Sequence, residues 1–316
     1  MKNKKNTSYI FVAIAAALIT AIAIYAPSFF AKYYMWKYNK TIPKLAPIPA
    51  FQKTDTLLIL SPHPDDETLC CSGAILNALS AGAQVYVVWM TAGDGFEWDD
   101  ILLTHKIKPK PEAMFSLGNR RITESKQAAK KLGIPENHLI YLGFPDRGLI
   151  HLFFSNYTIQ YTSTFTRYDK VPYSQALAPG TPYTGKNVTD LLMSVMDEVN
   201  PTIVLLPAPM DEHPDHKATC FFGLRSLGPK TENVTSFFWI VHGGLEWPIP
   251  KDWHPDLYLS PPRSMKSLGW ARLDMTKNQI DTKKQAILAY SSQYKALGPY
   301  MAAFDRRNEV FIKQSF

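Results

Sequence analysis

The chain has 316 residues, of which 46% are hydrophobic, so it can bury a sizeable core and is neither disordered nor fibrous. Its formal charge of +7 raises the question of nucleic-acid binding, but seven lysines within residues 1–44, which contain no acidic residue, account for the whole excess. Residues 45–316 are therefore formally neutral, and we expect no nucleic acid as a partner. The three cysteines, two of them adjacent, predict no disulfide framework.

The N-terminus predicts a membrane anchor. Residues 1–8 form a short basic tail, and residues 6–31 contain no charged side chain, which is about the length that a bilayer span needs. We expect a transmembrane signal-anchor at residues 9–30 rather than a cleaved signal peptide, because Pro27 follows the most plausible cleavage site and the apolar run is long. Lysines flank the span almost evenly, and the basic, acid-free start favours a catalytic domain outside the cytoplasm. Residues 31–53, which become proline-rich, are expected to link the anchor to a domain at residues 54–316.

Apolar runs alternate with helical patterns after this linker. Strands are expected at residues 56–60, 84–89, 139–142 and 202–206, and helices at residues 68–81, 121–132 and 190–199. Strands that alternate with helices are typical of a parallel sheet covered by helices. We therefore predict an α/β fold for residues 54–316, a Rossmann-like three-layer sandwich with a mostly parallel sheet.

Residues 144–189 interrupt this alternation. They show no helical periodicity and are rich in Tyr, Thr, Ser and Pro. A loop of this length inside a compact domain is usually functional or disordered, and the many aromatic side chains argue against disorder. Two interpretations stay open: an aromatic-rich insertion packed beside the active site, or rings that only bury one another.

Two strand-to-helix turns carry unusual polarity. The sequence LLILSPHPDDETLCCSGAIL begins at residue 57, and LLPAPMDEHPDHKAT begins at residue 205. Turns at the carboxyl ends of parallel strands share one edge of the sheet, so these two can converge in a crevice. Several carboxylates packed together repel one another unless a cation neutralises them, so the combination predicts a metal site, although either turn alone could be a helix cap with idle histidines. The crevice would contain His63, Asp65, Asp66, Glu67, Asp211, Glu212, His213, Asp215 and His216.

The sequence PHPDDE at residues 62–67, together with HPDH at residues 213–216, resembles the PIG-L/LmbE-like family of zinc-dependent N-acetylglucosaminyl deacetylases. The resemblance covers about residues 54–222 and returns weakly at residues 283–293. Two imidazoles and one carboxylate would leave coordination positions open, as a catalytic zinc requires, and zinc can lower the pKa of a bound water from about 15.7 to roughly 7. The resemblance implies His63, Asp66 and His216 as metal ligands, Asp65 as general base, and His213 as the group that assists the carbonyl and the leaving amine.

Further polar residues are expected to support this chemistry. The family suggests that Arg121 binds a substrate hydroxyl or phosphate, and the alternative is a salt bridge to Glu124 on the same helix. Asp146 could bind sugar hydroxyls or only hold a turn open. Glu67 and Asp215 are expected to orient the metal ligands.

The sequence thus predicts an enzyme that uses one Zn²⁺, with Fe²⁺ possible in the same site, to remove acetate from an N-acetylated amino sugar in a glycan, glycolipid or glycoside. The anchor makes the membrane a second partner, and the oligomeric state is not predicted. His242 follows an apolar run, where a lone histidine is more often structural, and it is only a weak candidate for the site. Two rivals stay open: a non-haem iron(II) oxidoreductase with the same facial triad, and an inactive carbohydrate-binding protein.

Overall fold

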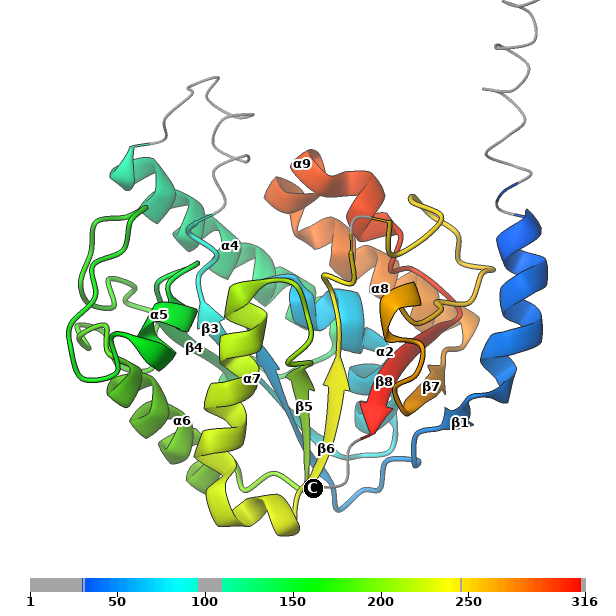
Figure 1. Cartoon of the computed structure of the whole chain (residues 1–316), viewed down its shortest axis with the longest axis horizontal. Coiled ribbons are helices and arrows are strands. Elements are labelled where there is room, and N and C mark those ends of the chain that lie inside the picture. The colour runs from blue at the N-terminus through cyan, green and yellow to red at the C-terminus, as the bar shows by residue number, and fades with distance from the viewer. Residues whose placement is uncertain (1–29, 31, 96–109, 245, 314–316) are drawn as a thin grey trace, which may run out of the picture.

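An eight-stranded sheet lies at the centre of the structure, a computed structural model that describes residues 30, 32–95, 110–244 and 246–313 (Figure 1). The strand order is β1-β7-β8-β6-β5-β2-β3-β4. Only β8 among the described strands runs antiparallel to its neighbours. The strands are β1 (Ala46–Pro47), β2 (Thr56–Ser61), β3 (Gln84–Thr91), β4 (Leu139–Phe144), β5 (Ile203–Pro207), β6 (Thr235–Trp239), β7 (Trp270–Asp274) and β8 (Asn308–Lys313).

Helices cover both faces of the sheet. One group packs together as α2 (Asp66–Ser80), α4 (Pro111–Leu132) and α8 (Lys277–Ala289). The other comprises α5 (Leu149–Phe154), α6 (Gly185–Val199) and α7 (Pro214–Leu227), and α9 (Ser291–Ala302) lies above the carboxyl ends of the strands (Figure 1). The predicted three-layer α/β fold with a mostly parallel sheet is confirmed.

The central strands are buried on both faces, which explains their continuous apolar sequences. All of Leu57, Leu58, Ile59 and Leu60 are fully buried, as expected for a strand between two helical layers. The four predicted strands correspond to β2, β3, β4 and β5. The helix expected at residues 121–132 is only the second half of α4, which begins at Pro111 and ends at Gly133 in the left-handed conformation.

The aromatic-rich segment is folded, and part of it is helical. Helix α5 forms within it, and α6 begins at Gly185, one residue after Thr184 caps the helix by accepting from the Asn187 N–H. The expectation that residues 144–189 lack helix is therefore wrong at both places. Short apolar helices such as α5 show too little periodicity to be found in a sequence. The side chains of Tyr173 and Tyr183 are fully buried.

The prediction of a single-pass membrane protein is corrected. Within the described residues, no helix has both the length and the apolar character needed to cross a bilayer. Residues 32–41 are helical, but this helix is short and carries Lys32, Lys37 and Lys40. The predicted span at residues 9–30 lies outside the described residues except for Phe30. We therefore withdraw the membrane anchor, the extracytoplasmic location and the membrane as a partner.

The predicted linker is partly integrated into the domain. Tyr38 and Ile42 are buried, and β1 pairs with β7 in parallel register, Ala46 opposite Ala271. This pairing extends the sheet by one edge strand.

A buried ion pair joins α8 to β8 and α2. Lys283 Nζ donates to Glu309 Oε1 at 2.9 Å, and both side chains are almost completely buried. The same carboxylate accepts from the Gly73 and Ala74 N–H groups of α2 at 2.8 and 3.1 Å. The carboxylate therefore connects three elements.

Replacing one partner of this pair should destabilise the protein. We expect Lys283→Met to lower the free energy of unfolding by about 3–5 kcal/mol, because Glu309 would remain buried without its cation. Denaturant titration measures the change. The control Lys277→Met alters an exposed lysine on the same helix and should have little effect; equal losses in both variants would contradict the prediction.

Candidate active site

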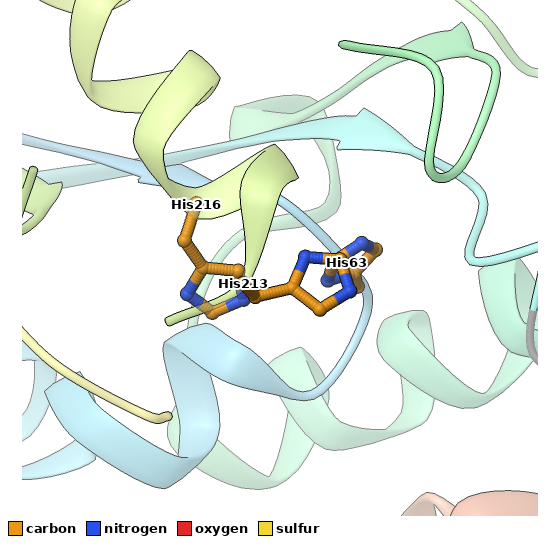
Figure 2. Close-up of side chains that lie close together, drawn as sticks. All are labelled: His63, His213 and His216. Carbon is orange, nitrogen blue, oxygen red and sulfur yellow. The ribbon is translucent and has the colours of Figure 1, made fainter. Parts of the chain in front are cut away.

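The two polar turns meet at the carboxyl edge of the sheet, as the sequence predicts. Strands β2 and β5 are neighbours, and the chain continues from β2 to β3 on one side and from β5 to β6 on the other. This is the switch point at which open α/β sheets bind ligands. Figure 2 shows that His63, from the turn after β2, lies beside His213 and His216 at the start of α7. The ring centroids are 4.8 to 5.4 Å apart.

The turn after β2 holds Asp65 in an unusual backbone conformation. Its φ is 125°, which is costly for a residue with a Cβ and needs support from its surroundings. Glu67 supplies that support, because its Oε2 accepts the Asp65 N–H at 3.2 Å and the Trp89 indole N–H at 2.9 Å. Its Oε1 accepts the Tyr290 hydroxyl at 2.5 Å. Glu67 thus ties the turn to β3 and to the residue that joins α8 and α9.

Asp66 lies between two imidazoles. Its Oδ2 is 3.1 Å from His63 Nδ1 and 3.2 Å from His216 Nε2. Both nitrogens of His216 are buried and lie 3.2 Å from a carboxylate oxygen, yet neither has the alignment of a hydrogen bond. This geometry is better explained by a cation that the imidazole and the carboxylate both bind than by a hydrogen bond between them. One carboxylate with two imidazoles is a donor set that suits Zn²⁺ or Fe²⁺.

Other donor sets overlap this one. Three groups have ligand atoms within 4.8 Å of one another, close enough to share one ion. They are His63 with His213 and His216, Asp66 with His216 and His242, and His63 with Asp146 and Asp215. His242, which the sequence indicated only as a weak candidate, therefore lies inside the cluster. Burial, followed by the charge of His216, lowers the pKa of His242 to about 4, so its imidazole is neutral at physiological pH.

Asp211, which the sequence placed in the crevice without a role, organises the second turn. Its Oδ2 lies 3.2 Å from His216 Nδ1 and accepts the Val241 and His242 N–H groups at 2.9 and 3.0 Å. Its Oδ1 accepts the His213 N–H at 2.9 Å. Burial opposes ionisation, but the charge of His216 and these hydrogen bonds lower the pKa of Asp211 to about 2. In the sequence, only its position two residues before His213 indicated that Asp211 contributes to the site.

His213 is neutral, and the proton sits on a defined nitrogen. Burial and the neighbouring His63 and His216 lower the pKa of His213 to about 2. Its Nδ1 accepts the Asp215 N–H at 3.2 Å, so in the neutral ring Nε2 carries the hydrogen. This assignment makes Nε2–H a hydrogen-bond donor at the site.

Asp215 and Asp146 both contact His63. Asp215 Oδ2 lies 3.4 Å from His63 Nε2 and accepts the Arg147 N–H at 2.5 Å, while Oδ1 accepts the Leu149 N–H at 3.1 Å. Asp146 Oδ1 lies 3.1 Å from the same Nε2. The charge of His63 holds the pKa of Asp146 well below its ordinary value despite burial. The loop after β4 is thus attached to the first turn.

Arg121 faces the first turn from α4. Its Nη2 donates to the Pro64 carbonyl at 2.7 Å and lies 3.3 Å from Asp65 Oδ2, whereas Glu124 pairs with Arg120 at 3.1 Å. Burial raises the pKa of Asp65 well above its ordinary value, and Arg121 opposes this shift. A carboxylate with a raised pKa is a stronger base.

These groups surround a pocket with a cavity volume of about 140 Å³. It is lined by His63, Asp65, Asp66, Arg121, Asp146 and His213 of the predicted residues. Glu67, Asp211, Asp215 and His216 are buried behind the lining, and Glu212 is exposed outside it. From the aromatic-rich segment, as far as the chain is described, only Asp146 and Arg147 reach the pocket. The tyrosines of the segment instead pack against their surroundings, although the Tyr173 hydroxyl donates to Asp94 Oδ2 at 2.6 Å beneath Asp146.

Asp94 should make stability depend on pH. Burial, followed by the charge of Asp146, raises the pKa of Asp94 from 3.8 to about 7. The folded state therefore binds more protons than the unfolded state between these values, so this group costs stability as pH rises, by roughly 4 kcal/mol above pH 7. We therefore expect the difference between the melting temperatures of Asp94→Asn and wild type to shift in favour of the variant as the pH is raised from 5 to 8. The control Asp197→Asn, at an exposed carboxylate, should show a constant difference; a constant difference for Asp94→Asn would refute the assignment.

The fold and the site define the class of protein: an α/β enzyme with a histidine and carboxylate cluster, able to hold a metal, at the switch point of its sheet. The chain belongs to the GlcNAc-PI de-N-acetylase (PIG-L) family, whose family model matches residues 58–226.

Known proteins agree with this assignment. The 1D-myo-inositol 2-acetamido-2-deoxy-alpha-D-glucopyranoside deacetylase of Mycobacterium leprae is 26% identical over 282 residues, which cover 78% of this chain and 82% of that protein. The diacetylchitobiose deacetylase of Thermococcus kodakarensis is 25% identical over 180 residues, 56% of this chain and 51% of that protein. The zinc-inhibited form of teicoplanin deacetylase Orf2 has the same fold, with a TM-score of 0.52, 22% identity, and 81% and 97% of the two chains covered.

Proposed function

We propose that this protein is a divalent-metal-dependent hydrolase that removes the acetyl group from an N-acetylated amino sugar. The observation that carries the proposal is the position of Asp66 Oδ2 between His63 and His216, with Asp65 and His213 lining the same pocket. A ligand set, a base and a hydrogen-bond donor are the groups that amide hydrolysis by water requires.

We assign His63, Asp66 and His216 as the residues that would hold one Zn²⁺, with Fe²⁺ as the second candidate, because Asp66 Oδ2 lies within 3.2 Å of a nitrogen of each imidazole. A divalent cation there would supply Lewis-acid chemistry, making water acidic and polarising the amide carbonyl. Asp211 and Asp215 lie against His216 and His63, so they are suited to keep the two imidazoles oriented.

Asp65 would accept a proton from the attacking water. Its carboxylate lines the pocket, Arg121 fixes its position, and its raised pKa favours proton transfer at moderate pH. The neutral His213 would donate its Nε2–H to the carbonyl oxygen as negative charge develops there. The proton taken by Asp65 would then reach the leaving nitrogen, because amines leave poorly without one.

The substrate is assigned from relatives and from the pocket. The Mycobacterium leprae enzyme is named for an acetamido-glucopyranoside of inositol, and the Thermococcus kodakarensis enzyme for diacetylchitobiose. Arg121 and Asp146 line the pocket and would bind sugar hydroxyls. The aromatic-rich segment supplies no ring to the described lining, which favours the interpretation that its rings mainly bury one another.

Acetate release tests the proposal. Metal-replete protein should release one acetate per amine formed from N-acetylglucosamine or its oligomers, at the same rate with and without oxygen. Oxygen-dependent turnover would favour the iron(II) oxidoreductase, and sugar binding without turnover would favour the inactive carbohydrate-binding protein. Comparison of oligomers with the monosaccharide then defines substrate length.

A further inference from the structure

The catalytic pocket changes character along the edge of the sheet. The strand order β4-β3-β2-β5-β6 places the ligand cluster after β2 and β5 in the middle of the pocket. At the β4 and β3 end the lining is polar, with Asp146, Arg147 and Gly95, and Arg121 joins them from α4. The opposite end comes after β6 and lies under α9.

This opposite end is apolar. Five side chains form it, and we call them the α9 wall: Leu69, Val241, Leu297, Tyr300 and Met301. The Tyr300 hydroxyl donates to the Val241 carbonyl at 2.7 Å, so its polar atom is engaged and its ring packs beside His242. Gln293 and His242 are the polar exceptions at this end. Gln293 lies in the first turn of α9, where the preceding residue, Ser292, donates to Glu124 of α4.

The reacting carbonyl carbon has two substituents, the sugar nitrogen and the acyl chain, and they must leave the ligand cluster in different directions. The polar end offers a guanidinium and a carboxylate, which suit the hydroxyls of a sugar. The α9 wall offers carbon surface, which stabilises an alkyl chain by removing it from water and cannot satisfy hydroxyl groups.

We propose that the α9 wall binds the acyl chain of the substrate, and that the enzyme hydrolyses N-acyl amino sugars with short unbranched chains longer than acetyl. This inference rests on the proposed function and specifies its substrate class. In the reaction a C–O bond forms between water and the acyl carbon, the C–N bond breaks, and the water protons go to the amine. The products are a short carboxylate and the free amino sugar. Except for Leu69, the residues of the wall lie outside residues 58–226, the segment that the family model matches.

Leu297 is the best position for a test, because it is half-buried and lies at the kink of α9, where a larger side chain can be accommodated. The substrates are glucosamine derivatives with acetyl, propanoyl, butanoyl and hexanoyl groups. We expect wild type to act on butanoyl about as well as on acetyl. In Leu297→Phe, kcat/KM for the butanoyl substrate should fall at least about tenfold more than kcat/KM for the acetyl substrate. The larger ring would occupy the space that the one or two additional methylenes of the acyl chain need. Leu288→Ala and Leu288→Phe are controls at an exposed leucine of α8 and should leave this ratio unchanged.

Inhibition by the carboxylate products gives a second readout that does not depend on turnover of the longer substrates. The inhibition constant should fall about fourfold for each added methylene in wild type and less steeply in Leu297→Phe. If wild type releases acetate but Leu297→Phe changes all acyl lengths equally, the acyl assignment is overturned while the proposed function stands. If metal-replete wild type releases no carboxylate from any of the four substrates, both are overturned.

Discussion

The Asp65→Asn variant should bind metal as wild type does and lose nearly all deacetylation. We expect kcat to fall by about 10²–10⁴-fold, the usual contribution of a positioned general base. The substitution keeps the size of the side chain. It also keeps the backbone N–H of residue 65, which donates a hydrogen bond to Glu67, so the turn after β2 should keep its shape. What disappears is the carboxylate that accepts the water proton. Steady-state kinetics and metal analysis of the purified protein measure the two effects separately.

The matched control is Asp197→Asn, at a carboxylate whose side chain is 71% exposed and which pairs with Lys230 on the surface. It should keep full activity. Asp65→Asn activity within tenfold of wild type would remove Asp65 from the mechanism. A loss of metal together with activity would instead make Asp65 part of the ligand set.

Removing a ligand should abolish both metal binding and catalysis. For His216→Ala we expect less than stoichiometric metal after dialysis and a fall in kcat of at least about 10³-fold, because ionised water is scarce at neutral pH without a cation. His216 is fully buried between Asp66 and Asp211, so its loss leaves two carboxylates without their shared imidazole. Chelation of wild type should produce the same loss, and added Zn²⁺ or Fe²⁺ should reverse it.

Asp211→Asn separates orientation from ligation. It keeps all three proposed ligands but changes the carboxylate that lies beside His216 Nδ1 and accepts three backbone N–H groups of the site. We therefore expect metal affinity to fall by about 10–100-fold, with activity restored at high metal concentration. His254→Ala is the control, because His254 is a histidine that lies outside the pocket lining. Unchanged metal affinity in His216→Ala would contradict the ligand assignment.

The sequence contained enough to predict the fold class and the meeting of the two turns. Continuous apolar runs such as residues 57–60 identify buried parallel strands, and the carboxyl ends of such strands share one edge. His63 and His216 were predicted to lie together because each belongs to the turn after such a strand, and the structure places them there. The roles proposed for the site residues remain predictions.

The sequence was a poor guide to the C-terminal half. Strands β6, β7 and β8 were not predicted, and β8 runs antiparallel to its neighbours, which an alternation of helices with parallel strands does not indicate. The predicted membrane anchor is withdrawn, because no helix of the described residues is long and apolar enough to cross a bilayer.

What the sequence determined by itself was local: which residues form strands, and which polar side chains stand at their ends. Only the tertiary structure decided which residues far apart in the sequence contact one another. Glu67 accepts a hydrogen bond from Tyr290, and Tyr300 lies at the pocket beside His242, although more than 50 residues separate each pair. Such contacts leave no periodic signal, because they depend on how the packed layers place distant segments side by side.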